Sequence, residues 1–335
     1  MRRHLGEGRA ADPARGRGRP GIHVDVGAAA ATIAGRLHRT PLLSSDTLGR
    51  AFGGRAFLKA ELLQKTGSFK PRGVLTKLAS LTEEERDRGV IAASAGNHAA
   101  ALAHGCALES VDCLVVMWQG ASESKRAAAA GYGAAIDQEA SGPTEVFARL
   151  ARLQEETGRV LVHPFDDPLV VAGQGTVGRE IAEDLGEVEV VVVPVGGGGL
   201  VAGIASALPD RRVVAVEPEG SAALHLALAA GEPVPLTPES VADGLNAPFA
   251  GGLPLRLCGE LGVESVLVSE EEIHAGFRFL YERAKLAAEP GGAAGVAALL
   301  AGKVPRVEGA TVAVVVSGGN VDPKIASGIL KRNPL

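Results

Sequence analysis

The sequence has little cysteine and no apolar run long enough to cross a membrane. Its three cysteines, Cys106, Cys113 and Cys258, are odd in number and show no C-x-x-C spacing. This argues against a disulfide framework or a zinc site and fits a reducing compartment, so we expect a cytoplasmic protein. A long uncharged stretch, residues 190–208, is divided by Pro194 and its glycines into a strand and a helix. We therefore expect no membrane partner.

The sequence also lacks an excess of positive charge. It has 34 Lys and Arg against 39 Asp and Glu, a formal net charge of −5, which argues against nucleic acid as a partner. A length of 335 residues allows two or three domains, and 46% hydrophobic residues are typical of a globular chain. Residues 1–20 differ, with six arginines, four glycines, two prolines and no apolar period. They predict a disordered basic tail.

Four consecutive glycines follow an apolar run at residues 188–195, which has the character of a strand buried on both faces. A helix is predicted directly after them, over residues 200–208. A strand, a glycine turn and a helix form a geometry in which free N–H groups can hold a phosphate. The region has neither the G-x-G-x-x-G spacing nor a P-loop. A turn used only for tight packing is the simpler alternative, but four glycines exceed what a turn needs.

One lysine stands in the sequence 65–73, K-T-G-S-F-K-P-R-G. Pro71 suits the first position of a helix, which places Lys70 at the helix start beside unpaired N–H groups. A positive environment there favours a neutral, nucleophilic amine. A surface lysine at a helix start is the simpler alternative when this segment is taken alone.

A strand predicted over residues 311–316 ends in Ser317-Gly318-Gly319-Asn320. A hydroxyl at the C-terminal end of a strand lies on the edge where open α/β sheets bind ligands. A poised lysine, a phosphate site and a strand-end hydroxyl together suggest pyridoxal phosphate, which needs an imine partner, a phosphate grip and a partner for its pyridine nitrogen.

Strands and helices alternate along the chain, which predicts a parallel α/β sheet rather than a barrel. Strands are predicted over residues 56–60, 90–93, 111–117, 134–136, 160–162, 213–217 and 266–268, besides the two named above. Helices are predicted over residues 99–107, 122–132, 143–157, 168–185, 221–230 and 269–288. Residues 231–262 are rich in proline and glycine and predict loops and short turns.

Four motifs in this order, G-S-F-K-P-R-G, S-A-G-N-H-A, G-G-G-G-L and S-G-G-N-V-D, resemble those of the fold-type II pyridoxal-phosphate enzymes. The similarity is strongest to the threonine/serine dehydratase and serine racemase branch, and closest to threonine dehydratase (threonine ammonia-lyase). The segment H-P-F-D-D-P, with A-G-Q-G-T after it, also resembles that branch. The resemblance extends over about residues 33–325.

The resemblance implies a tryptophan synthase beta-like fold with two parallel-sheet α/β domains and the active site in the cleft between them. A large domain would comprise residues 21–88 and 165–335, and a small inserted domain residues 89–164. The implied reaction is the dehydration and deamination of L-threonine, and of L-serine, to a 2-oxo acid and ammonia. A homodimer or higher homo-oligomer is implied as well.

The resemblance also implies roles for particular residues. Lys70 would bind pyridoxal 5'-phosphate as an imine and then act as the base at Cα, with Phe69 near the ring. Asn97 would bind the phenolic oxygen, and Ser317 would meet the pyridine nitrogen. The phosphate would be held by the backbone of Gly196, Gly197, Gly198, Gly199 and Leu200, and the substrate carboxylate would be received by Ser94, Asn97 and His98.

Four positions depart from the branch or remain open. Ala95 stands where racemases of this branch carry a serine that protonates Cα, which favours the dehydratase interpretation. Glu217 matches one ligand of the family's divalent-cation site, but Ala223 stands where a second acid is expected, so a structural role for Glu217 competes with metal binding. Glu289 resembles a family glutamate near the ring, and a helix-capping role is an equal alternative.

Other kinds of function remain open at this point. A dinucleotide-binding protein is one, since Glu217 lies about twenty residues after the glycine turn, as a ribose-binding acid would. A non-catalytic, ligand-sensing relative is another. Within the enzymes, a serine or amino-acid racemase or a β-replacement enzyme on the same scaffold is the alternative to the lyase.

Overall fold

The chain folds around two separate β-sheets, and the computed structural model describes residues 24–331. The predicted basic tail at residues 1–20 lies outside the described residues. The larger sheet contains, in spatial order, β1 (Leu42–Ser44), β2 (Arg55–Ala60), β10 (Thr311–Val316), β7 (Val190–Pro194), β8 (Arg212–Pro218) and β9 (Glu264–Val268). The smaller sheet contains β5 (Ala135–Ala140), β4 (Cys113–Trp118), β3 (Val90–Ala93) and β6 (Val160–Leu161). All neighbouring strands are parallel except β1 and β2.

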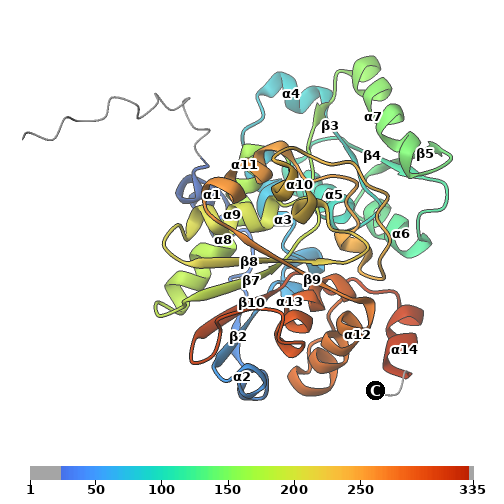
Figure 1. The fold of residues 1–335 in the computed structure, drawn as a ribbon. Helices are drawn as coiled ribbons and strands as arrows, with labels where there is room; N and C mark the ends of the chain where they lie inside the picture. The colour runs from blue at the N-terminus through green and yellow to red at the C-terminus, as the bar shows by residue number, and fades with distance from the viewer. Residues whose placement is uncertain (1–23, 332–335) are drawn as a thin grey trace, which may run out of the picture.

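Helices cover both faces of the larger sheet, with α8 and α9 on one side and α12 and α13 on the other (Figure 1). The helices are α1 (Val26–Ile33), α2 (Asp46–Phe52), α3 (Pro71–Leu78), α4 (Glu83–Arg88), α5 (Asn97–Glu109), α6 (Glu123–Gly131), α7 (Pro143–Thr157), α8 (Pro168–Asp184), α9 (Gly199–Ala207), α10 (Ala223–Ala230), α11 (Gly252–Glu260), α12 (Glu270–Phe279), α13 (Pro290–Leu300) and α14 (Pro323–Lys331). Among the helices of residues 24–331, none has the length and apolar character needed to cross a membrane.

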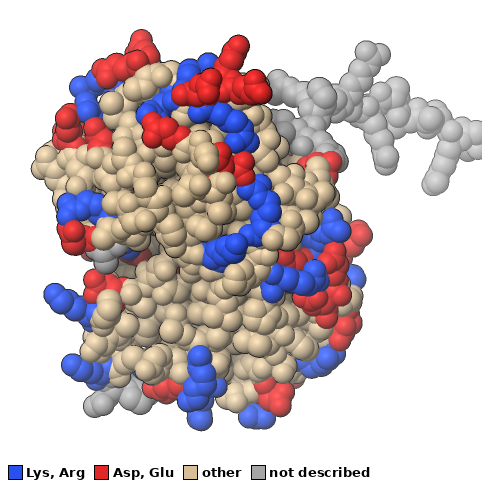
Figure 2. Space-filling view, turned by 180° about the vertical axis from the view of Figure 1, so that it is seen from behind, with Lys and Arg blue, Asp and Glu red and all other residues tan. Residues whose placement is uncertain are grey.

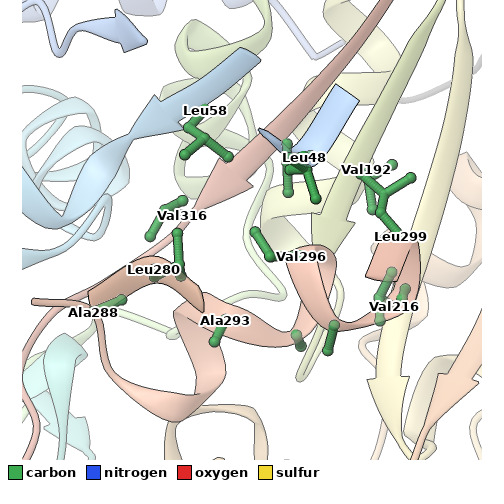
Figure 3. Packing of buried hydrophobic residues seen from close by; sticks show 14 of the residues in the cluster. Leu48, Leu58, Val192, Val216, Leu280, Ala288, Ala293, Val296, Leu299 and Val316 are labelled. Atoms are coloured by element: carbon green, nitrogen blue, oxygen red, sulfur yellow. The ribbon is translucent and has the colours of Figure 1, made fainter. Parts of the chain in front are cut away.

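The apolar run that predicted a doubly buried strand serves both faces of the larger sheet. Val190 and Val192 of β7 join the core with α12 and α13, whereas Val191 and Val193 join the core with α8 and α9. This is the alternation that the pleat of a strand requires. Figure 3 shows the first core, where Val192 lies beside Leu299 and Val316 lies beside Leu280.

The smaller sheet also has two covered faces, and α3 packs against one of them. Val74 and Leu78 of α3 lie in the same buried cluster as Val115 of β4 and Leu102 of α5. The opposite face packs on α7. Because α3 also packs on α8, the helix that follows Lys70 lies between the two sheets.

Most predicted elements are confirmed to within one or two residues, and β3 and α7 have the predicted bounds. Two predictions are wrong. The helix predicted over residues 269–288 ends as α12, followed by one π-helical turn, Leu280–Ala284, because Lys285 takes a left-handed conformation with φ 59°. Residues 231–262 contain α11, whose first N–H groups, at Gly252 and Leu253, are capped by the carboxylate of Asp166.

A buried network of charges fixes the start of α3. Arg72 forms a bidentate salt bridge with Glu61, in which Nε and Nη2 each donate at 2.8 Å. Its Nη1 donates to Glu180 at 2.6 Å. Lys59 is fully buried and donates to Glu180 at 2.6 Å and to the carbonyl of Thr40 at 2.8 Å. Buried charges require such pairing, so removing one partner leaves the others uncompensated.

Replacing Arg72 by alanine is expected to lower the free energy of unfolding by about 3–5 kcal/mol, because Glu61 would remain buried without its cation and Glu180 would keep only Lys59. Urea unfolding of the purified variant measures this loss. Arg179→Ala, which removes an exposed pair with Glu183 on α8, is the matched control and should cost no more than about 0.5 kcal/mol. Equal losses in the two variants would contradict the role given to the network.

Candidate active site

Lys70 lies at the junction that the sequence predicted, directly before Pro71 at the start of α3. Its Nζ donates to the carbonyl of Pro164 at 2.9 Å and lies 5.1 Å from the centre of the Phe69 ring. Burial lowers the pKa of Lys70 to about 8, and the charge of Glu289 opposes this shift. The amine therefore has the lowered pKa that the sequence predicted, and the main cause of this shift is the loss of water around the buried side chain.

The lysine loop and the end of β10 are joined by backbone pairing. The N–H of Phe69 donates to the carbonyl of Ser317 at 3.2 Å, and the N–H of Gly319 donates to the carbonyl of Gly67 at 2.9 Å. Ser68 and Gly318 form an antiparallel bridge between these two bonds. Ser317 is buried, and its hydroxyl has no hydrogen-bond partner among residues 24–331. The pairing thus places Lys70 and the unpartnered hydroxyl of Ser317 in one site.

The four glycines end at α9, as predicted. Gly198, at the N-cap, takes φ 93° and has no side chain to cap the helix. Within the described part of the chain, the N–H groups of residues 197–200 have no protein acceptor. Free N–H groups at the positive end of a helix dipole form a site for an anion such as a phosphate.

Phe165 closes the glycine loop from one side. A Cβ placed on Gly197 would lie 2.3 Å from the Phe165 ring, and one on Gly199 would lie 2.9 Å from the Phe165 backbone. Both positions therefore need glycine for close approach. Because Phe165 follows Pro164, whose carbonyl holds Lys70, the glycine loop and the lysine belong to one site.

A second helix start faces this site from the smaller sheet. Asn97 is the first residue of α5, and Ser94 Oγ accepts the N–H of Gly96 at 3.2 Å. The N–H groups of Asn97 and His98 have no acceptor among the described residues, and they could receive a carboxylate. The amide of Asn97 donates to Glu289 at 2.7 Å and accepts from Asn320 at 2.8 Å.

The side chain of His98 points elsewhere than a substrate-binding role would need. It is buried, and its Nε2 donates to the carbonyl of Val162 at 2.8 Å. Burial, with the nearby charge of Lys70, lowers the pKa of His98 to about 3, so the ring is neutral at physiological pH. Its contribution to carboxylate binding would come from its backbone N–H.

Glu217, which matched a family metal ligand, caps a helix. Its two carboxylate oxygens accept the N–H groups of Leu224 at 2.7 Å and His225 at 2.8 Å, at the start of α10. Burial raises its pKa to about 7. Within residues 24–331, no three His, Cys, Asp or Glu side chains are placed to share a metal ion.

The residues present fit pyridoxal phosphate. An amine with a lowered pKa can bond to an aldehyde, the free N–H groups before α9 match a phosphate, and the unpartnered hydroxyl of Ser317 can meet a ring nitrogen. The residue-by-residue interpretation of the sequence gave no role to Pro164, Phe165 or Asn320. The H-P-F-D-D-P and S-G-G-N-V-D motifs contain all three. The motifs therefore indicated that these residues belong to the site, although the spacing of the residues assigned no role to them.

Comparison with known proteins agrees with this geometry. The family model described as "Pyridoxal-phosphate dependent enzyme" matches residues 33–318. The chain is 44% identical over 314 residues to an L-threonine ammonia-lyase of Thermotoga maritima, covering 92% of this chain and 78% of that protein. The structure of a threonine deaminase from T.th. is similar with a TM-score of 0.82 and 40% identity, covering 90% and 99% of the two chains. Maize serine racemase gives a TM-score of 0.87 and 34% identity, covering 91% and 97%.

Gly197→Ala is expected to weaken the binding of pyridoxal phosphate about tenfold or more, because the new Cβ would collide with Phe165 and displace the N–H groups of the loop. Fluorescence titration of the cofactor-free protein measures the affinity. Gly259→Ala is the matched control, since a Cβ there meets no atom within 4 Å. Equal affinities in the two variants would remove the phosphate from this loop.

Proposed function

The chain belongs to the family of pyridoxal-phosphate-dependent enzymes, and we propose that it dehydrates and deaminates L-threonine, and also L-serine, to a 2-oxo acid and ammonia. The observation that carries this proposal is the convergence of Lys70, the free N–H groups before α9 and the hydroxyl of Ser317 on one site. The identity with an L-threonine ammonia-lyase and with a threonine deaminase supports the choice of substrate.

The cofactor would be held by residues that follow the carboxyl ends of β2, β7 and β10 in the larger sheet and of β3 in the smaller one. Its phosphate would lie on the N–H groups of Gly196 to Leu200, and Lys70 would hold its aldehyde end beside Phe69. Asn97 would donate its second amide hydrogen to the phenolic oxygen of the cofactor, since the first is donated to Glu289. When bound, pyridoxal phosphate supplies an electron sink for the pair left on Cα when a proton leaves.

Lys70 would remove that proton. A base must be unprotonated near the working pH, and the lowered pKa of about 8 makes an appreciable fraction of Lys70 neutral there. The carbonyl of Pro164 holds Nζ when the amine is free. The β-hydroxyl takes up a proton and leaves as water, and the released enamine tautomerises to an imine. One water then hydrolyses this imine to 2-oxobutanoate and ammonia, so that no water is gained or lost overall.

The substrate carboxylate would be received at the start of α5. The free N–H groups of Asn97 and His98 lie at the positive end of a 13-residue helix, and Ser94 adds a hydroxyl. Ser317 would meet the ring nitrogen with a neutral hydroxyl. Such a partner leaves the ring a weaker electron sink than a carboxylate would, which favours prompt loss of the β-substituent.

We further propose a two-domain division and a homo-oligomer. Every strand of the smaller sheet lies within residues 89–164, and every strand of the larger sheet lies outside that range, which supports the predicted boundaries. Figure 2 shows a face whose lower central part carries few Lys, Arg, Asp or Glu side chains. Depletion of charge is typical of interface cores. Light scattering is expected to give at least twice the mass of 34.1 kDa, and a monomer would contradict the proposal.

We also propose a cytoplasmic location, on the basis of the cysteines. The three cysteines, Cys106, Cys113 and Cys258, are all free and buried, which fits a reducing compartment.

The lyase assay measures 2-oxobutanoate after L-threonine is added to the cofactor-bound protein. Wild type is expected to produce it, and Lys70→Ala is expected to lose both the visible absorbance of the bound cofactor and at least about 10³-fold of the rate. Phe52→Leu, a change at the end of α2 beside residues 54 and 310, where β2 and β10 begin rather than end, controls for general damage. Cofactor absorbance without 2-oxo acid would contradict the lyase, and racemisation of serine would then identify the alternative reaction.

A further inference from the structure

Glu289 is a buried carboxylate for which the proposed reaction has no use so far. It is 5% exposed and stands at the N-cap of α13, yet its side chain does not cap that helix. Its backbone N–H donates to the carbonyl of Gly318 at 3.0 Å, one residue from Ser317. A Cβ on Gly318 would lie 2.4 Å from Glu289 Oε1, so a side chain at position 318 would force the Glu289 carboxylate to move.

The side chain of Glu289 is directed at Asn97 instead. Glu289 Oε1 accepts from Asn97 Nδ2 at 2.7 Å, while Asn97 Oδ1 accepts from Asn320 Nδ2 at 2.8 Å. Asn320 Nδ2 also donates to the carbonyl of Thr66 at 2.7 Å, which orients it as a donor. Reversing the Asn97 amide would oppose two donors at Asn320 and two acceptors at Glu289. The amide therefore has one orientation, with one N–H left for a ligand.

The charges around Glu289 come from several segments. Burial and the charge of Asp243, in the short helix Asp243–Leu245, raise the pKa of Glu289 to about 7. The hydrogen bond from Asn97, the charge of Lys125 on α6 and the N–H of Asn320 oppose this shift. Lys70 faces the same carboxylate, which favours the ammonium form of the amine. His98, in the first turn of α5, is neutral and turned toward Val162.

We propose that Glu289 is a positioning residue of this active site: it holds the Asn97 amide so that one Asn97 N–H is directed at the bound cofactor. The inference rests on the proposed function for the identity of the ligand, since Asn97 is the residue that would contact the ring oxygen. The ionised carboxylate is the strong acceptor in this contact, and protonation weakens the hold. Glu289 also raises the pKa of Lys70, so that one carboxylate acts on both the amide and the amine.

A structural role as a helix cap does not account for this arrangement. An N-cap carboxylate that stabilises its own helix accepts from the second or third N–H of that helix, and Glu289 makes no such bond. Its contact joins α13, which covers the larger sheet, to α5, which covers the smaller one. The contact crosses the site rather than closing a helix end.

Two variants separate the acceptor from the charge. Glu289→Gln keeps an oxygen that can accept from Asn97 but cannot ionise, whereas Glu289→Ala removes both. The measurements are the affinity of the cofactor-free protein for pyridoxal phosphate from pH 6 to pH 9, by fluorescence, and the visible spectrum of the bound form over the same range. Glu217→Gln is the matched control, because Glu217 is another buried carboxylate whose pKa is raised to about 7.

In wild type, the affinity is expected to fall as the pH drops below about 7, since Glu289 is then protonated, in addition to the fall caused by protonation of Lys70. Glu289→Gln should bind at pH 8 within about threefold of wild type and show a shallower fall, with no spectral change centred near pH 7. Glu289→Ala should bind about tenfold more weakly or worse at pH 8. Glu217→Gln should keep the wild-type pH dependence.

Either of two results would overturn the inference: a Glu289→Gln protein that titrates like wild type, or a Glu289→Ala protein that binds the cofactor with wild-type affinity. Thermal unfolding of each variant identifies a loss of fold, which would lower affinity at every pH equally. The readouts do not require turnover. If wild type produced no 2-oxo acid but Glu289→Gln lost the titration, the proposed reaction would fail while the role of Glu289 stood.

Discussion

The pairing of residues 66–69 with residues 317–320 is the constraint on which the site depends. Each backbone bond in it contributes only about 0.5–1.5 kcal/mol, too little to bring together segments some 250 residues apart. The larger sheet brings the two segments together, because β2 and β10 are parallel neighbours with Ala60 opposite Val316. Both strands end at the same edge, and the chain leaves each of them into the paired segments. Lys70 and Ser317 meet because the two strands are in register.

The crossover at residues 162–167 supplies the second set of constraints, since it joins the smaller sheet to the larger one. The carbonyl of Val162 accepts from His98, that of Pro164 accepts from Lys70, and Phe165 packs on the glycine loop. Asp167 caps α8 through the N–H groups of Leu169 and Val170 and pairs with Lys77 of α3 at 2.8 Å. Because nearly every residue of this segment is held by a contact, the Pro164 carbonyl is fixed in place, and the position of Lys70 is restricted with it.

Local signals account for what the sequence could predict. A proline at the first helical position located Lys70 at a helix start, and the Asp167-Pro168 pair marked the start of α8. The parts that were missed depend on distant partners. Helix α11 is capped by Asp166, 86 residues earlier in the chain, and no local pattern announces such a cap. The lowered pKa of Lys70 was anticipated, but its main cause, burial, exists only once the two sheets are packed.

The same dependence explains how charge is distributed in the site. The carboxylate of Glu289 and the hydroxyl of Ser317 belong to segments joined by the bond from the Glu289 N–H to the Gly318 carbonyl. The carboxylate nevertheless binds the Asn97 amide, which leaves Ser317 as a neutral group at the strand end. A carboxylate at the ring nitrogen would keep that nitrogen protonated and would therefore stabilise the electron pair left at Cα. With the negative charge held at Asn97 instead, elimination would be favoured. Gly318 leaves room for this arrangement, because a Cβ there would lie 2.4 Å from Glu289 Oε1 and displace the carboxylate.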